Sequence, residues 1–155
     1  MTPRIQDPFK TAPEPIKALV AVETAIKASG LEHSLIELVK LRASQINQCA
    51  YCIHMHATDA RKAGETEMRI YLLSAWRESS LYSPRERAAL GWTEALTLIS
   101  ETGASDEDYE AVKREFSEAE QVNLTMLIGT INAWNRFAIG LRAAHPKEAA
   151  RVAAA

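Results

Sequence analysis

With 155 residues, of which 47% are hydrophobic and 25% charged, the chain has the length and composition of one globular domain, which we expect to span residues 1–155. Its formal net charge of −2 provides no basic field for a phosphate backbone, so nucleic acid is not an expected partner. Neither the first residues, MTPRIQDPFK, nor any later segment carries the apolar run of a secretory signal or a membrane span, so we expect a cytoplasmic protein without membrane contact.

The first half of the chain predicts helices, because it contains no run of alternating β-branched residues that would indicate strands. The first helix should extend from about Glu14 to Ser29. A second should begin at Ser34, and the residues SQIN should interrupt it. A third should begin near Gln48 and end at Lys62 or Ala63, before a glycine. The side chains available to cap this third helix are Ser44 and Asn47.

The second half also predicts helices, each introduced by a recognisable start. A fourth helix should cover about Glu65 to Trp76, followed by the linker RESSLYS. The residues SPRE combine a serine cap at Ser83, a proline at the first helical position and a glutamate at the third. The helix that they open should stop before Gly103. Another should start at Ser105, where three acidic residues match the positive end of the helix dipole.

The final helix is the most apolar segment. A capping box of Ser117 and Glu120 should open it, and it should run from about Glu118 to Ala143. Its apolar residues lie on nearly every side: Val122, Leu124, Met126, Leu127, Ile128, Ile131, Trp134, Phe137 and Ile139. A helix that is apolar all round lies inside a domain or between subunits. We therefore predict a compact all-α fold whose long C-terminal helix is central and forms a homo-oligomer interface. The alanine-rich tail beyond it should fray.

Both cysteines and two of the four histidines lie in CAYCIHMH, residues 49–56. In a reducing compartment, a CxxC pair is more typical of catalytic or metal-binding cysteines than of a structural disulfide. On a helix, Cys49, Cys52 and His56 share one face, because they are three and four residues apart. His54 points away from that face. A disulfide between the two cysteines would need only a small local adjustment.

The residues alone leave open what this cluster does. His56 lies one turn from Cys52 and is placed to accept its proton, and a second thiol can resolve the oxidised product. The first-turn amides instead favour a thiolate at Cys49. Two simpler interpretations are buried, inert thiols and a zinc site of Cys49, Cys52 and His56, although structural zinc takes four ligands.

Glu37 has two competing interpretations. It follows Ser34 by three residues, so SLIE has the pattern of a capping box. A catalytic histidine also needs a third group that holds its tautomer, and a carboxylate serves that purpose.

The spacing E-x11-C-x-x-C-x-x-x-H, formed by Glu37, Cys49, Cys52 and His56, resembles the core motif of the alkylhydroperoxidase D-like branch of the carboxymuconolactone decarboxylase superfamily. The similarity continues through LIELVKLRASQINQCAYC, DARKAGETEMRIYLLSAWRESSLYSPRERAALGWTEALTLI and INAWNRFAI. It implies an all-helical oligomer in which the CxxC pair reduces peroxides, and Glu37 and His56 relay a proton to the second cysteine. It also implies that Cys52 attacks the peroxide and that Cys49 resolves the product.

We therefore expect a thiol-dependent peroxidase-like oxidoreductase that reduces organic hydroperoxides in antioxidant defence, without a metal or organic cofactor. Base proximity favours Cys52, because His56 is one turn from it and two turns from Cys49. The dipole at the helix start contributes only about 0.3–1 kcal/mol. Cys49, expected to be the more exposed thiol, should meet an external dithiol reductant.

One residue departs from the pattern of the characterised peroxidases, which can carry a histidine directly before the second cysteine. That position is Tyr51 here, and a phenol with a pKa near 10 is a poor base at neutral pH. Two rival functions remain. One is a lyase acting on a lactone acid, whose chemistry requires no CxxC pair. The other is a non-enzymatic helical assembly module whose cysteines are inert or bind metal.

Overall fold

The computed structural model describes residues 2–145, which form nine α-helices and one 3₁₀ turn and contain no strand. The helices are α1 (Pro8–Thr11), α2 (Pro13–Lys27), α3 (His33–Ile46), α4 (Ala50–Lys62), α5 (Glu67–Leu72), α6 (Pro84–Thr97), α7 (Ile99–Thr102), α8 (Asp106–Glu115) and α9 (Glu118–Leu141), and the 3₁₀ turn is Leu73–Ala75. The predicted all-α fold is confirmed. The alanine-rich tail, for which we predicted fraying, lies outside the described residues.

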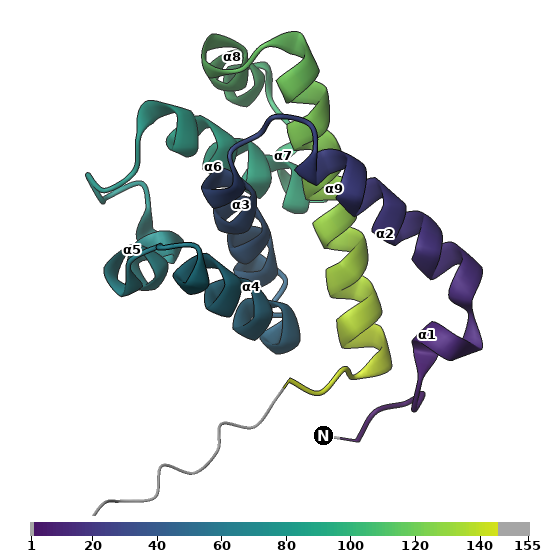
Figure 1. Ribbon diagram of the computed structural model, residues 1–155. Helices are drawn as coiled ribbons and strands as arrows, with labels where there is room; N and C mark the ends of the chain where they lie inside the picture. Colours follow the sequence, from purple (N-terminus) through teal and green to yellow (C-terminus); the bar gives the residue numbers. More distant parts are fainter. Residues whose placement is uncertain (1, 146–155) are drawn as a thin grey trace, which may run out of the picture.

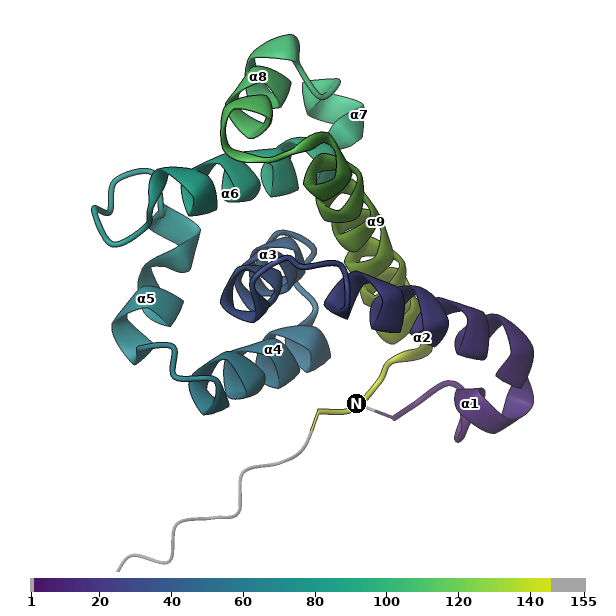
Figure 2. The same cartoon turned by 45° about the horizontal axis from the view of Figure 1, so that its top comes forward.

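Helix α3 lies at the centre of the molecule, with α4 below it, α6 above it and α9 beside it (Figures 1 and 2). Every residue from Leu35 to Leu41 is buried. The long helix α9 packs against α2, α3, α6 and α8 and keeps one face open to solvent. The helix that is covered on all sides is therefore α3, and α9 forms one wall of the domain.

Two apolar clusters occupy opposite sides of α3. The larger joins it to α2, α6, α8 and α9 through Ile26, Leu31, Leu35, Ile36, Val39, Ala88, Ala89, Trp92, Ala95, Val112, Phe116, Leu124, Leu127 and Ile128. The smaller joins it to the 3₁₀ turn and α6 through Leu38, Leu41, Leu73, Trp76, Tyr82 and Leu90. Burial of these side chains is the main force that holds the helices together. Within residues 2–145, no helix combines the length and apolarity needed to cross a lipid bilayer.

The three helix starts predicted at Ser83, Ser105 and Ser117 are confirmed. Both capping boxes form, one between Ser83 and Glu86 and one between Ser117 and Glu120. The Ser105 side chain caps α8 as expected. These agreements reflect interactions that span only three residues, so they depend little on the remainder of the fold.

Other predicted boundaries were wrong. The expected helix from Glu65 to Trp76 is the shorter α5 followed by the 3₁₀ turn. The expected single helix up to Gly103 breaks at Leu98 into α6 and α7. The short helix α1 was not expected at all. The final helix begins at Glu118 as predicted and ends at Leu141, two residues before the expected Ala143, because Arg142 takes a left-handed conformation.

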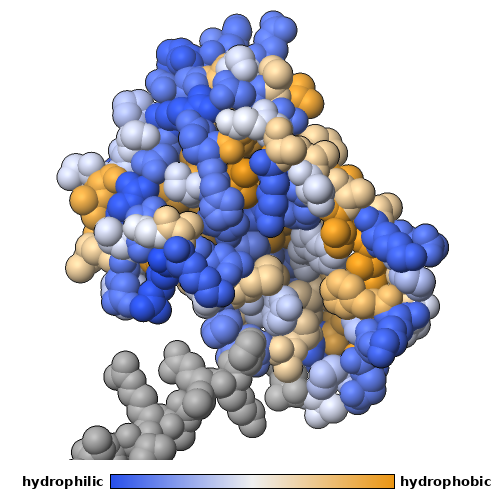
Figure 3. All heavy atoms as spheres, viewed as in Figure 1, coloured by the Kyte–Doolittle hydropathy of each residue, from blue (hydrophilic) through white to orange (hydrophobic). Residues whose placement is uncertain are grey.

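Apolar surface gathers over α2 and α9 (Figure 3). On α9 the side chains of Val122, Met126 and Ile139 are 63%, 48% and 47% exposed. Val122 and Met126 lie one turn apart, and the small residues Gly129 and Ala133 continue the exposed stripe. The described part of the chain therefore leaves an apolar face of its longest helix without a partner.

Candidate active site

The corner between α3 and α4 places the two cysteines. Helix α3 ends at Ile46, and Gln48 adopts a left-handed conformation with φ of 57°. Cys49 is then extended and forms the N-cap of α4, where its Sγ accepts a hydrogen bond of 3.4 Å from the Cys52 amide. Helix α4 begins at Ala50, close to the expected start near Gln48, but the expected Ser44 or Asn47 cap was wrong. The sulfur of Cys49 replaces an oxygen as the capping atom.

Cys49 and Cys52 are joined by a disulfide, with their Cα atoms 5.3 Å apart. Both side chains are buried, at 1% and 2% exposure, and Ala138 of α9 packs against them. The expectation that Cys49 is the more exposed thiol was therefore wrong. Ala138, near the end of α9, covers the pair although it lies more than 80 residues after Cys52 in the chain, so tertiary packing decides this burial.

Glu37 and His56 meet between α3 and α4. The Glu37 Oε2 atom accepts a hydrogen bond of 2.8 Å from His56 Nδ1, and both side chains are about 5% exposed. Ser34 lies inside α3, whose N-cap is Glu32, so the alternative capping box of Ser34 and Glu37 does not form. The carboxylate fixes the tautomer of the histidine by holding the proton on Nδ1.

The charge of Glu37 follows from its neighbours. Burial by itself raises the pKa of this carboxyl. The hydrogen bond and the charge of His56, with a further contribution from Lys40, outweigh burial and hold the pKa below its ordinary value. Glu37 is therefore a carboxylate at neutral pH and stabilises a protonated imidazole.

The second ring nitrogen of His56, Nε2, is buried and has no hydrogen-bond partner among the described residues. It is the nitrogen left free to accept a proton, because Nδ1 is bound to Glu37. Cys52 lies four residues earlier on the same face of α4. In the disulfide neither sulfur carries a proton, whereas a reduced Cys52 would supply the donor that Nε2 lacks.

A set of asparagines braces the corner that carries the cysteines. The Asn47 side-chain amide donates to the Oδ1 atoms of Asn132 and Asn135 on α9, both at 2.9 Å. The Asn135 side chain, which is fully buried, donates in turn to Ser44 Oγ at 3.0 Å. These bonds tie the end of α3 to α9.

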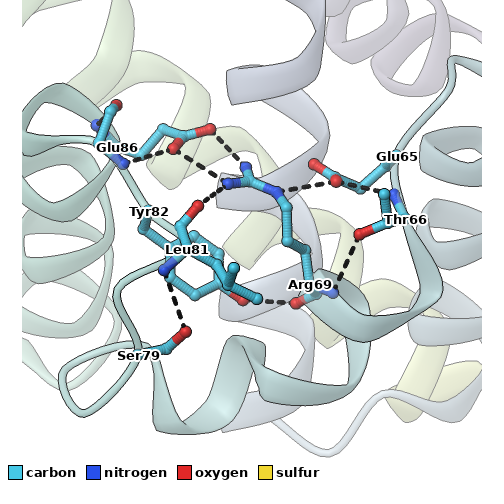
Figure 4. Close-up of polar contacts among 8 residues, drawn as sticks. Glu65, Thr66, Arg69, Ser79, Leu81, Tyr82 and Glu86 are labelled. Atoms are coloured by element: carbon cyan, nitrogen blue, oxygen red, sulfur yellow. Dashed lines mark hydrogen bonds and ion pairs between the residues drawn. The ribbon is translucent and has the colours of Figure 1, made fainter.

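A second polar cluster, between α5 and α6, is centred on Arg69 (Figure 4). Its guanidinium donates to Glu65 at 2.8 Å and to Glu86 at 2.5 Å, and also to the Leu81 carbonyl. The Tyr82 hydroxyl donates to the Arg69 carbonyl. The guanidinium and both carboxylates are paired within the cluster, which accordingly fastens α5 and the following loop to α6.

The remaining residues near the motif point away from the site. Tyr51 is 36% exposed, and His54 stacks on His145 with ring centroids 5.5 Å apart. Two cavities, of about 460 and 300 Å³, lie among the described residues, and neither is lined by a cysteine. Because Glu37, His56 and both cysteines are buried, the site is a closed cluster of these side chains.

Residues 13–95 match the model of the carboxymuconolactone decarboxylase family. The chain is 46% identical over 133 residues to the uncharacterised protein YdfG of Bacillus subtilis (strain 168). The aligned region covers 86% of this chain and 90% of that protein. It is similar to a crystal structure from Agrobacterium tumefaciens of a protein of unknown function, described as a candidate AhpD antioxidant defence protein. That similarity has 49% identity and a TM-score of 0.90, and covers 95% of this chain and 100% of the other.

A more distant structure shows the fold alone. It is an uncharacterised peroxidase-related protein from Ralstonia eutropha JMP134, described as an alkylhydroperoxidase AhpD core. The TM-score is 0.79 at 20% identity, with 96% of this chain and 79% of the other covered.

Proposed function

Because the chain belongs to the carboxymuconolactone decarboxylase family, in its alkylhydroperoxidase D-like branch, we propose that it is a thiol-dependent peroxidase that reduces organic hydroperoxides through Cys49 and Cys52. The observation that carries the proposal is the buried hydrogen bond between Glu37 and His56, one turn from Cys52 in the disulfide. A nucleophile, a base and a carboxylate that orients the base form the arrangement that activates a thiol.

The first half of the cycle oxidises Cys52. Its thiol gives a proton to His56 Nε2, and Glu37 stabilises the imidazolium. The thiolate attacks the terminal oxygen of the hydroperoxide, so an S–O bond forms and the O–O bond breaks. The leaving alkoxide takes the proton from His56 and departs as the alcohol. Cys52 is left as a sulfenic acid.

The second half returns the enzyme to its reduced state. The Cys49 sulfur attacks the Cys52 sulfur, the S–O bond breaks, and the hydroxyl leaves as water with the Cys49 proton. The product is the Cys49–Cys52 disulfide. An external dithiol then reduces it by exchange and becomes a disulfide itself. One hydroperoxide and one dithiol thus yield an alcohol, water and an oxidised dithiol.

The assignment of Cys52 as the attacking thiol rests on its distance from the base. Cys49 is the N-cap of α4, where the amides and the dipole favour a thiolate by about 0.3–1 kcal/mol. His56 is one turn from Cys52 and two turns from Cys49. A hydrogen-bonded imidazolium in a buried site stabilises a thiolate more than the dipole does.

Two single substitutions test the division of labour. Cys49→Ser should form a sulfenic acid on Cys52 that dimedone traps, but should not turn over, because no second thiol resolves it. Cys52→Ser should give no rapid adduct. Mass spectrometry of the peroxide-treated variants measures both. Rapid trapping on Cys49 in the Cys52→Ser protein would reverse the assignment.

The same measurement on the wild-type chain separates the rival functions. Loss of two protons under mild peroxide supports the disulfide cycle. Free thiols that peroxide leaves unchanged would favour the lyase. One zinc ion retained per chain would favour the metal-binding assembly module.

A further inference from the structure

Lys40 of α3 is a buried cation that the mechanism does not yet use, with only 3% of its surface exposed. Its ammonium forms an ion pair with Glu23 of α2, and the two side chains are 4% and 16% exposed. Lys40 follows Glu37 by three residues, so both side chains project from the same side of α3. A buried positive charge therefore lies one helical turn from the carboxylate that holds His56.

Stability does not account for this pair. Removing two charges from water costs several kcal/mol for each ion, and apolar residues of similar volume often serve a core equally well or better. The Glu23 Oε1 atom is buried and has no hydrogen-bond partner in the described part of the chain, so the pair is incompletely satisfied. Apolar contacts would fasten α2 to α3 without this cost. The feature that apolar contacts cannot supply is the charge.

We propose that Lys40 is a positioning residue for the proton relay, and that its ammonium, held by Glu23, keeps Glu37 ionised and sets how readily Cys52 and His56 exchange a proton. Burial raises the pKa of the Glu37 carboxyl, and the contacts with His56 lower it. The Lys40 charge acts in the same direction as His56 and lowers that pKa further. The expected effect on peroxide turnover rests on the proposed function. The expected effect on the proton affinities of His56 and Cys52 does not depend on it.

The other charged groups around Glu37 either act on it weakly or are already paired with one another. Lys40 and Glu23 are therefore the two charges that single substitutions can remove. On α3 itself, His33 acts weakly on Glu37. On α6, the Glu94 carboxylate is already held by Arg42, Arg77 and the Trp76 indole. The buried polar side chains that α9 turns toward this region are the uncharged asparagines of the brace. With His56 neutral, the cluster of Glu23, Glu37 and Lys40 carries one net negative charge, which protonation of His56 cancels.

Removing the positive charge of Lys40 and removing the negative charge of Glu23 should shift the pKa values of His56 and Cys52 in opposite directions. Lys40→Met removes a positive charge, so the pKa of His56 and that of the Cys52 thiol should both rise by roughly one unit. Glu23→Gln removes a negative charge and leaves the ammonium beside Glu37, so both pKa values should fall. Two readouts apply to the full chain in its reduced form: NMR titration of the His56 ring, and the pH dependence of Cys52 alkylation by iodoacetamide in a Cys49→Ser background.

Two controls separate charge from packing. Lys40→Arg keeps the charge and should restore the wild-type values. Arg85→Met removes a part-buried cation that pairs with Glu32 and Glu120, and not with Glu23 or Glu37. This variant should lower thermal stability without moving either pKa. If Lys40→Met does not fold, Glu23→Gln still tests the sign.

Shifts in the same direction for the two variants, or shifts below roughly 0.2 pH unit, would overturn the inference and leave Lys40 as a fastener of α2. Opposite pKa shifts in a protein that does not reduce hydroperoxides would support the inference and contradict the peroxidase proposal. Peroxide turnover with unshifted pKa values would support the peroxidase proposal and contradict the inference. The two proposals therefore fail separately.

Discussion

Glu37 and His56 lie 19 residues apart in the chain and meet because α3 and α4 pack side by side. The contact gives His56 a defined tautomer and leaves Nε2 as its one available nitrogen. It also explains why a glutamate is tolerated in a stretch of α3 that is buried throughout. A carboxylate at this depth is stable only when it is hydrogen-bonded and paired with positive charge.

The first residue-scale prediction concerns Glu37→Gln. The amide retains the shape and one acceptor oxygen, but it cannot stabilise an imidazolium, so peroxide turnover should fall by roughly 100-fold. Circular dichroism should show the same helix content as the wild type. Unchanged turnover together with a lowered melting temperature would show that Glu37 has only a structural role.

The same substitution predicts a pH dependence of stability. The pKa of Glu37 is lowered in the folded protein from an ordinary value of 4.5. Its contribution to stability is therefore complete above that ordinary value and is lost as the pH falls through the lower, folded value. The difference in unfolding free energy between the wild type and Glu37→Gln should shrink below about pH 4.5. Urea titrations at several pH values measure it.

At the scale of elements, the start of α9 is held by Glu120. Its Oε2 accepts from the Ser117 amide at 2.8 Å, and its Oε1 accepts from Arg85 Nη2 at 2.6 Å. These contacts, led by the backbone hydrogen bond, lower the pKa of Glu120 to about 2. Because Arg85 also binds Glu32, at the N-cap of α3, this one carboxylate helps to align the long helix with the central one.

Glu120→Gln should destabilise the fold by roughly 1 kcal/mol at neutral pH, a figure discounted for the solvent around this carboxylate. The depressed pKa means that this contribution is present above about 4.5 and disappears as the pH falls toward about 2. Thermal melts across that range measure it. Glu118→Gln, in the same helical turn but at an exposed position, is the matched control, and an equal loss there would refute the capping explanation.

At the scale of the whole molecule, α9 has two roles that meet along its length. Near its C-terminal end, Ala138 covers the disulfide, and Asn132 and Asn135 brace the α3–α4 corner. Its opposite face exposes Val122 and Met126. Because α9 both covers the disulfide and carries unpartnered apolar surface, packing of a partner on its exposed face would also bear on how closed the site is.

We predict that the chain forms a homo-oligomer through this face, because exposed apolar stripes on long helices mark interaction surfaces. Met126→Lys should shift the assembly toward monomers while helix content is retained. Light scattering at micromolar concentration measures both proteins. A wild-type mass of only 17.1 kDa would contradict the prediction.

The helical class, the capping boxes and the E-x11-CxxC-x3-H spacing were predictable from the sequence, because each depends on contacts within one or two turns of the same segment. The break between α3 and α4 was also predicted, although at SQIN and not at the left-handed Gln48. The break at Leu98 was not predicted, because no proline or glycine directly precedes it and the packing of neighbouring helices determines where the chain turns. Local propensity is a weak determinant of such boundaries.

The sequence by itself brought Cys49, Cys52 and His56 together, since their spacing places them on or beside one face of a single helix. Only the tertiary structure decided between the two interpretations of Glu37, buried both sulfurs under α9 and paired Lys40 with Glu23. Each of these contacts joins residues from different helices. Their geometry depends on how the helices pack around the core, and the pattern within one helix does not specify that packing.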